Sequence, residues 1–306
     1  MERAVTAYRT FRAPVEGGEL AGGVWNPDAD GVPILAPHGI TATHLSWPLI
    51  VERLPGTRFI APDLRGRGRS NALPSPFGMP AQAEDMLRVL DHFEIDRAVV
   101  VGHSMGGFVS VLLAAMHPDR VSSLVLVDGG LPIAPPAGVA AQDAAAATLG
   151  PALTRLTMEF ASREAYRQFW LAHPALGPYW NAEMAAYVDY DLDGVEPHLH
   201  SSADPNAIAE NSLQMDGSDG YSEALHSLDL PIDFLRAPRG LLDAAPLYTP
   251  ADVARETAGI PHIRTHEVQD VNHYTIVLSD RGADQVAPVI SAQLVRATMP
   301  AGEGTL

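Results

Sequence analysis

The chain of 306 residues is 46% hydrophobic and 19% charged, which suits one globular core with a large insertion. Its 37 acidic and 20 basic residues give a formal net charge of −17, and every basic residue is an arginine. This balance argues against nucleic acid or an anionic membrane as a partner, because both would be repelled by a strongly acidic surface.

Two absences in the sequence narrow the class of protein further. The chain has no cysteine, which excludes disulfides, thiolate catalysis and cysteine metal sites. Residues Met1–Thr6 lack the apolar run of a secretory signal, and no apolar stretch reaches the 18 residues of a membrane span. The sequence therefore predicts a soluble, cytoplasmic protein.

The first part of the chain alternates short apolar runs with helical patterns. The runs Tyr8–Arg12 and Glu19–Trp25 flank a Gly-Gly pair and predict an N-terminal hairpin. This alternation predicts a mostly parallel sheet that is covered by helices on both faces. The later elements, in chain order, are strands at Val32–Ala36 and Thr57–Ala61, a helix over Pro80–Phe93, a strand at Arg97–Val101, a helix over Phe108–Met116 and a strand at Val121–Val127.

The pattern changes after residue 130. A segment rich in Pro, Ala and Gly, Leu131–Ala141, precedes helix-like pieces with many Trp and Tyr, and no convincing buried strand occurs up to about residue 228. Strands return at Pro231–Leu235 and Thr265–Val268, and a helix from about Asp284 to Thr298 follows. We therefore expect residues 1–130 and 231–306 to form a core domain and residues 131–230 to form an inserted helical cap.

The most informative motif is Gly102-His103-Ser104-Met105-Gly106, which joins a predicted strand to a predicted helix. This is the G-x-S-x-G nucleophile elbow in the strand–turn–helix context that its chemistry requires. The sharp turn lifts the Ser104 hydroxyl above the sheet edge, and the glycines leave room for a strained backbone. The helix that follows presents N–H groups to a developing anion. Ser104 is therefore the candidate nucleophile.

Three other motifs accompany the elbow: His38-Gly39, the Asp63–Ser70 loop and a late Asn272-His273. With them the chain resembles the α/β-hydrolase superfamily over residues 19–130 and 231–298. The resemblance implies an α/β fold with a doubly wound, mostly parallel sheet and an inserted helical cap. Within the Asp63–Ser70 loop, Arg65 is expected to pair with Asp63 and to stay outside the site.

The resemblance also implies roles for particular residues. Ser104 would be the nucleophile and His273 the general base, in the chain order that the family uses. His273 lies on a loop after a predicted strand, and histidine has a pKa that suits proton transfer near neutral pH. The backbone N–H groups of Ile40 and Met105 would form the oxyanion hole.

The acid that orients His273 is open between two aspartates. Asp243 follows the strand at Pro231–Leu235 and lies 30 residues before His273, which agrees with the position that the family usually uses. Asp128 ends the preceding strand and is the alternative, because some members carry the acid there. Asp243 is the first choice, since Asp128 is also typical of a plain turn before two glycines.

Two patterns that are typical of metal sites lack required ligands. Asp189–Gly194 matches the opening of an EF-hand loop, but its twelfth position is His200 in place of a bidentate Glu. His198 and His200 form a pair without an apparent third ligand. We therefore expect neither a metal nor a cofactor.

Together these features predict acyl transfer to water, in which Ser104 attacks a carbonyl, His273 takes its proton and Asp243 orients the imidazole. We expect a small-molecule substrate, an apolar carboxylic ester or lactone, because the cap is rich in aromatic side chains. Two alternatives stay open: a carbon–carbon bond hydrolase or lyase with the same triad, and a receptor-type ligand-binding protein on the same fold. The sequence leaves the oligomeric state open.

Overall fold

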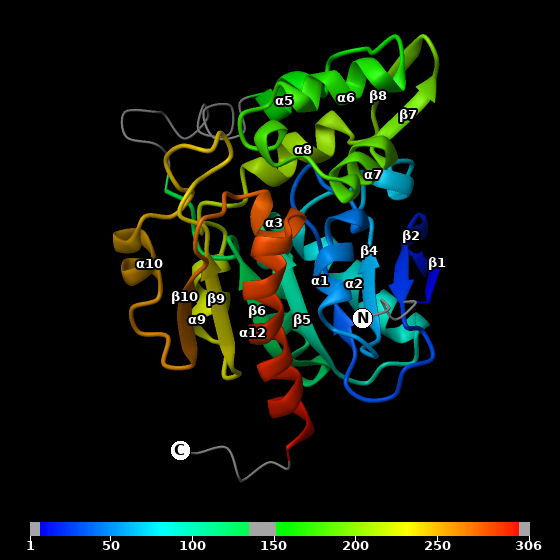
Figure 1. Cartoon of the computed structure of the whole chain (residues 1–306). Coiled ribbons are helices and arrows are strands. Elements are labelled where there is room, and N and C mark those ends of the chain that lie inside the picture. The colour runs from blue at the N-terminus through cyan, green and yellow to red at the C-terminus, as the bar shows by residue number, and fades with distance from the viewer. Residues whose placement is uncertain (1–6, 135–150, 300–306) are drawn as a thin grey trace.

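The computed structural model describes residues 7–134 and 151–299. Eight strands form one sheet in the order β1-β2-β4-β3-β5-β6-β9-β10 (Figure 1). Strand β2 is antiparallel to both of its neighbours, and the other neighbours pair in parallel. The strands are β1 (Tyr8–Val15), β2 (Gly18–Trp25), β3 (Ile34–Leu35), β4 (Phe59–Pro62), β5 (Ala98–His103), β6 (Val121–Val127), β9 (Ile232–Arg236) and β10 (Ile263–Glu267).

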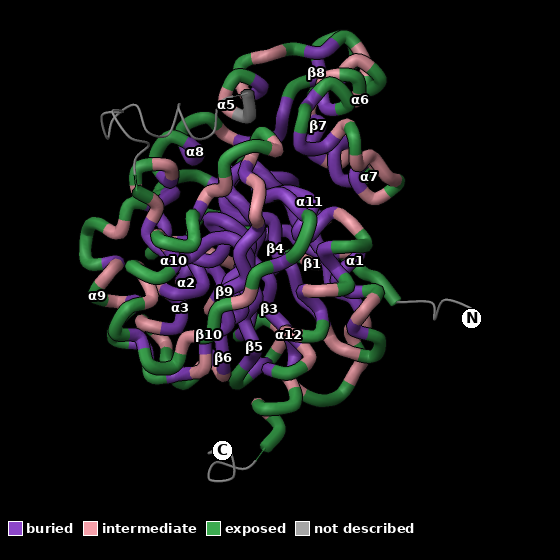
Figure 2. Tube along the Cα trace, turned by 60° about the vertical axis from the view of Figure 1, so that its left-hand side comes forward, coloured by how far each residue is buried: buried purple, intermediate pink, exposed green. Residues whose placement is uncertain are grey.

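The apolar pattern of each strand explains its place in the sheet. In β5 every residue is buried, and β6 is buried from Ser123 onward, as expected for strands that are covered on both faces. The hairpin β1–β2 lies at one edge, where most of β1 is exposed. Figure 2 shows the buried strands in the middle of the molecule. The sheet predicted from the sequence is therefore present, with its most apolar strands at the centre.

Helices cover both faces of the sheet. One face packs against α2, α3, α9 and α10, and the other packs against α1, α11 and α12. These helices are α1 (Pro48–Glu52), α2 (Met79–His92), α3 (Met105–Met116), α9 (Tyr221–His226), α10 (Pro250–Glu256), α11 (Thr275–Leu278) and α12 (Asp280–Thr298). Short 3-10 turns occur at η1 (His44–Ser46), η2 (Gly68–Ser70), η3 (Pro118–Arg120) and η4 (Gly177–Tyr179).

The starts of two helices, α12 and α3, differ from the predicted bounds. Helix α12 begins at Asp280 instead of about Asp284, because the Ser279 side chain accepts a hydrogen bond from the N–H of Gly282 and caps the helix there. Helix α3 begins at Met105, directly after the elbow serine. None of the described helices is both long and apolar enough to cross a membrane.

The cap lies above the carboxyl ends of the central strands (Figure 1). It contains α5 (Pro151–Arg155), α6 (Arg163–Leu171), α7 (Ala182–Tyr190), α8 (Pro205–Ser212) and a hairpin of β7 (Leu192–Val195) and β8 (His198–Ser201). Side chains of Ser162, Asn181 and Asp204 cap α6, α7 and α8. Most of the predicted linker Leu131–Ala141 lies outside the described residues.

Two findings differ from the all-helical cap that the sequence predicts. The hairpin β7–β8 begins within the stretch that resembles an EF-hand opening, whose first residues belong to α7. Its β8 strand buries alternate residues, which is the period of a strand. Helix α9 packs on the core, where the Tyr221 ring lies 4.9 Å from the Phe108 ring and its hydroxyl donates to the carbonyl of Gly130. Residues 221–226 thus pack with the core domain in space.

Candidate active site

The nucleophile elbow has the strained geometry that its sequence predicts. Ser104 follows β5 with φ 53° and ψ −124°, and its N–H donates to the carbonyl of Val127 at 3.0 Å. A Cβ at Gly106 would lie 2.2 Å from the carbonyl oxygen of Pro37, so only glycine fits there. The side chain of Ser104 consequently stands at the carboxyl edge of the sheet, where open α/β sheets bind ligands.

The imidazole of His273 lies beside the candidate nucleophile Ser104. His273 follows β10 in a loop, and its Nε2 lies 3.1 Å from Oγ of Ser104. The Asn272 side chain fixes this loop by accepting hydrogen bonds from two backbone N–H groups that follow His273, at 3.0 and 2.9 Å. Nε2 of His103 donates to the carbonyl oxygen of His273 at 2.9 Å. The carbonyl of His273 and the N–H groups of the next two residues are therefore all fixed by hydrogen bonds, which holds the His273 ring in place.

The carboxylate of Asp128 contacts the other nitrogen of the His273 ring. Asp128 comes directly after β6 with φ 45°, is fully buried, and places Oδ2 2.7 Å from Nδ1 of His273. Its Oδ1 accepts a hydrogen bond from the N–H of Ala237 at 2.9 Å. Because an ionised carboxylate only accepts, the proton belongs on Nδ1, and Nε2 offers its lone pair to Ser104. Asp128, His273 and Ser104 thus form one hydrogen-bonded row.

Asp243, the first choice of acid from the sequence, lies elsewhere. Among the described residues, Asp128 is the only acid that is hydrogen-bonded to the His273 ring. Asp128, the alternative acid from the sequence, therefore holds the position against His273 that was expected for Asp243. The reason is strand order, because β6 is the neighbour of the nucleophile strand β5, whereas β9 is one strand further out. The Asp243 carboxylate accepts instead from Arg239 at 2.7 Å, Tyr179 at 3.0 Å and Asn272 at 2.9 Å.

The glycine that follows Asp128 packs against the elbow. A Cβ at Gly129 would lie 2.1 Å from the carbonyl oxygen of Ser104. Contact with the nucleophile therefore requires glycine at this position, which a plain turn after a strand would not. Asp128, directly before Gly129, consequently stands close to the elbow, a placement that the sequence alone does not show.

The two predicted oxyanion donors have free backbone N–H groups. Ile40 lines the pocket beside Ser104, and Met105 is the first residue of α3, where N–H groups have no partner within the helix. Within the described chain, neither N–H donates to a protein acceptor. Both groups are therefore available to bind an oxyanion.

His38 fixes the peptide that carries the Ile40 N–H. Its Nδ1 donates to the carbonyl of Gly39 at 2.8 Å, and its Nε2 accepts from the N–H of Leu64 at 2.9 Å. Burial lowers the pKa of His38 to about 4, so the ring is neutral at pH 7 and keeps this tautomer. Because C=O and N–H of a trans peptide point in opposite directions, a fixed Gly39 carbonyl also fixes the Ile40 N–H.

A mainly apolar pocket opens above these groups. Among the described residues that line it, none is Asp, Glu or Arg. Burial raises the pKa of Tyr274 to about 12, so this lining hydroxyl is neutral at pH 7. The core and the cap both contribute to the apolar walls, which include Ile133, Met215, Leu241, Leu247, Val277 and Leu278.

Most aromatic side chains of the cap serve packing. Tyr187 of α7 lines the pocket. Phe160 and Trp170 are 5% and 3% exposed and belong to the apolar core, and Trp180 packs against its edge. Of these four residues, Tyr187 is therefore the one that is placed to contact a substrate.

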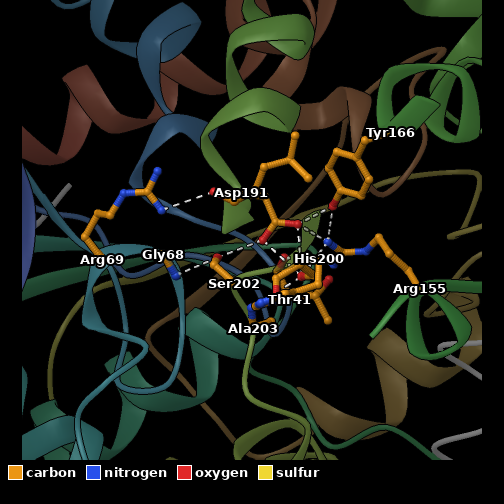
Figure 3. Close-up of polar contacts among 11 residues, drawn as sticks. Thr41, Gly68, Arg69, Arg155, Tyr166, Asp191, His200, Ser202 and Ala203 are labelled. Carbon is orange, nitrogen blue, oxygen red and sulfur yellow. Dashed lines mark hydrogen bonds and ion pairs between the residues drawn. The ribbon is translucent and has the colours of Figure 1, made fainter. Parts of the chain in front are cut away.

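A buried ion pair holds the cap together and touches the oxyanion loop. Figure 3 shows Arg155, Tyr166 and Asp191 pointing toward one another inside the cap. Arg155 is ion-paired with Asp191, and both hydrogen-bond to the Tyr166 hydroxyl. Nη2 of Arg155 also donates to the carbonyl of Thr41 at 3.4 Å. The cap thus contacts the loop that carries Ile40.

The suspected metal ligands do not assemble a site. Residues 7–134 and 151–299 contain no group of three or more His, Cys, Asp or Glu side chains that could hold a metal ion. His198 and His200 lie on one exposed face of β8, because residues two apart in a strand point the same way. Arg65 also differs from expectation, since it pairs with Asp85 at 2.7 Å, while Asp63 pairs with His44 at 2.8 Å.

Comparison with known protein families identifies the family to which the chain belongs. The chain belongs to the alpha/beta hydrolase fold family, whose model matches residues 32–193, just over half of the chain. This confirms the superfamily and the fold class that the sequence predicts.

Curated relatives match part of the chain. A serine hydrolase-like protein of Danio rerio is 39% identical over 125 residues, which are 40% of this chain and 38% of that protein. Lipase LipV of Mycobacterium tuberculosis is 40% identical over 95 residues, 31% of this chain and 36% of the lipase. A putative non-heme haloperoxidase of Mycobacterium phage D29 is 38% identical over 100 residues, 32% of this chain and 36% of that protein. The chain thus spans little more than a third of their length.

Solved structures share the whole fold at low identity. E-2-(acetamidomethylene)succinate hydrolase superposes with a TM-score of 0.74 and 22% identity, over 94% of this chain and all of that chain. A thioesterase domain from the curacin biosynthetic pathway gives a TM-score of 0.71 and 19% identity, over 93% of this chain and 99% of that chain. At these identities the likeness establishes the fold alone.

Proposed function

We propose that the protein is a serine hydrolase that cleaves small, uncharged carboxylic esters or lactones through an acyl-enzyme. The observation that carries this proposal is the hydrogen-bonded row from Asp128 through His273 to Ser104, next to a mainly apolar pocket. Membership in the alpha/beta hydrolase family supports it, as does the lipase among the partial relatives.

In the proposed reaction, Oγ of Ser104 attacks the substrate carbonyl while Nε2 of His273 takes the hydroxyl proton. The carbonyl oxygen becomes an oxyanion that the N–H groups of Ile40 and Met105 bind. The imidazolium, stabilised by Asp128, then protonates the leaving alcohol. Water attacks the acyl-enzyme with His273 as base, and the acid product leaves.

The pocket lining supports an uncharged substrate. A charged group would lose its hydration in the pocket without a partner of opposite charge, because the described lining has no Asp, Glu or Arg and the chain has no lysine. Small neutral acyl groups fit this environment best. We therefore expect esters of short or medium apolar acids to react faster than esters of dicarboxylic acids.

Covalent labelling tests the proposal directly. A fluorophosphonate is expected to label Ser104 in the native protein, and Ser104→Ala is expected to lose both labelling and ester turnover. Ser110, which is buried in α3 and bonded to the carbonyl of Gly106, serves as the control, and Ser110→Ala should stay labelled. A native protein that is not labelled, or that is labelled elsewhere, would refute the assignment.

A substrate panel tests the role of the pocket wall. We expect Tyr187→Ala to shift the preference among small, medium and bulky esters, lactones and a diketone, because Tyr187 lines the pocket. Trp170→Ala is the matched control, since Trp170 is buried and does not line the pocket. It should lower stability and leave the order of preference unchanged. Faster cleavage of the diketone than of every ester would replace the ester proposal by carbon–carbon bond hydrolysis.

A further inference from the structure

Four arginine side chains in the described part of the chain are buried, and one of them differs from the rest. Arg65 pairs with Asp85, Arg155 with Asp191 and Arg236 with Glu267. Arg67 is 0% exposed, yet among the described residues no carboxylate lies within ion-pair distance of it. A buried charge without a partner is costly and calls for a reason.

The contacts of Arg67 lead to the oxyanion hole. Its Nε donates to the carbonyl of Ile40 at 2.8 Å, and its Nη2 lies 3.7 Å from Sδ of Met105. These two residues carry the proposed oxyanion N–H groups. Nη2 also donates to Oδ1 of Asn211 in cap helix α8 at 2.7 Å, and Nη1 donates to the backbone carbonyl of Arg65 at 2.7 Å. All the oxygen partners of this guanidinium are neutral groups.

The hydrogen bonds of Arg67 and His38 together fix the backbone on both sides of Ile40. His38 holds the carbonyl of Gly39, which belongs to the peptide before Ile40. Arg67 holds the carbonyl of Ile40, which belongs to the peptide after it. Because both flanking peptides are planar and fixed, the direction of the Ile40 N–H is set.

We propose that Arg67 is a positioning residue of the oxyanion hole, which orients Ile40 and adds a positive charge behind the oxyanion that no ion pair in the described chain neutralises. This inference rests on the proposed serine-hydrolase function. In a buried site with low effective dielectric, a fixed positive charge stabilises the oxyanion more than the neutral substrate. Burial lowers the pKa of Arg67 to about 9, although the more distant Asp204 carboxylate acts to raise it, so the side chain is charged at pH 7.

Three variants separate the effect of the positive charge of Arg67 from the effect of its hydrogen bonds. Arg67→Gln removes the charge and most of the donors, whereas Arg67→Lys keeps the charge. Asn211→Asp keeps every donor of Arg67 and places a carboxylate against it, which neutralises the charge. Arg65→Gln is the control, because Arg65 is as buried but bonds to Asp85 and the carbonyls of Glu16 and Pro74 instead of the oxyanion loop.

Each variant is assayed for kcat and KM on an activated ester and for binding of a trifluoromethyl ketone, which adds to the serine and forms an oxyanion. For Arg67→Gln we expect kcat to fall about 10–100-fold, KM to change less than about 3-fold, and ketone affinity to fall in parallel with kcat/KM. For Asn211→Asp we expect kcat and ketone affinity each to fall by about 3–10-fold. Arg67→Lys should keep most of the kcat and ketone affinity that Arg67→Gln loses.

Two results would overturn the inference while the native protein still reacts with fluorophosphonate. One is a folded Arg67→Gln protein with unchanged kcat and ketone affinity, and the other is an equal loss in Arg65→Gln. If Arg67→Gln does not fold, Asn211→Asp decides, and unchanged ketone affinity there overturns the role of the charge. A native protein that fluorophosphonate does not label would instead refute the proposed function, and the inference with it.

Discussion

Asp128 and Asp243 follow neighbouring strands of the sheet, and both have left-handed backbone, with φ 45° and 57°. Both also lie near the loop that carries His273. The Asp128 side chain is fully buried and contacts Nδ1 of His273, whereas the Asp243 side chain is 24% exposed and contacts Asn272, one residue earlier. Two acids with the same local signature thus have different partners, because only one follows the strand beside the nucleophile.

The surroundings of Asp243 explain what it does instead. Arg239, Tyr179 and Asn272 all donate to its carboxylate. Tyr179 belongs to the cap and Asn272 to the loop of His273, so Asp243 links the cap to that loop. We infer that Asp128 determines the reactivity of His273 and that Asp243 contributes mainly to stability.

The largest expected effect comes from Asp128→Asn. A neutral amide no longer stabilises the imidazolium and can select the wrong tautomer, so kcat should fall by about 10⁴-fold. Steady-state kinetics on an activated ester measure this loss, with Asp243→Asn as the matched control, for which we expect less than about a tenfold loss. Losses in the reverse order would return the role of the acid to Asp243.

An intermediate effect is expected for Asn272→Ala. The change removes the acceptor of two backbone N–H groups after His273, the donor to the carbonyl of Ala175 and one of three donors to Asp243, so the His273 loop should become less ordered. We expect kcat to fall about 10–100-fold and the free energy of unfolding to fall by about 1–3 kcal/mol. Unchanged kcat in this variant would show that the loop is held without Asn272.

Asp243→Asn is expected to lower stability in a pH-dependent way. Burial alone would raise the pKa of the Asp243 carboxyl, but hydrogen bonds from Asn272, Arg239 and Tyr179 outweigh it and lower the pKa. A lowered pKa in the folded state stabilises the protein above the unfolded pKa of about 3.9, and this is lost as the pH falls through the folded value. We expect the variant to lose about 1–3 kcal/mol at pH 7.

Denaturation at several pH values checks this prediction. The gap between the native protein and Asp243→Asn should close below about pH 4, where the native carboxyl takes up its proton. Asp270→Asn is the control, because Asp270 pairs with the same Arg239 but its side chain is 59% exposed. It should change stability by less than about 1 kcal/mol. A gap that does not depend on pH would contradict the role assigned to the Asp243 charge.

The smallest effect is expected for Tyr179→Phe. The change removes one of three donors to Asp243 and keeps the aromatic ring. We expect the free energy of unfolding to fall by about 0.5–1.5 kcal/mol and kcat to stay within about 2-fold of the native value. A large loss of kcat would mean that the contact between the cap and Asp243 controls His273, which would narrow the difference between the two acids.

Much of the fold could be read from local sequence patterns. Strand β6 has the bounds that its apolar run predicts, and the elbow at Ser104 was recognised because a strand, a turn and a helix follow one another in the chain. His273 is predicted from the resemblance to the α/β-hydrolase superfamily together with its place on a loop after a predicted strand. The β7–β8 hairpin was not predicted, because it lies in a polar stretch without a clear alternation in β7. Helix α9 packs on the core although the sequence assigns its residues to the cap, because contacts between distant residues decide that packing.

The sequence by itself determined the α/β class, the parallel core, the serine at the elbow and the histidine, because those features depend on residue periodicity and on neighbours along the chain. Only the tertiary structure decided which aspartate reaches the His273 ring, because that depends on the order of strands in the sheet and on contacts between residues 145 positions apart. The same holds for Arg67, whose contact with Ile40 spans 27 positions and its contact with Asn211 spans 144. The role proposed for Arg67 depends on its burial and on the lack of an ion pair to it among the described residues, and both are properties of the folded chain.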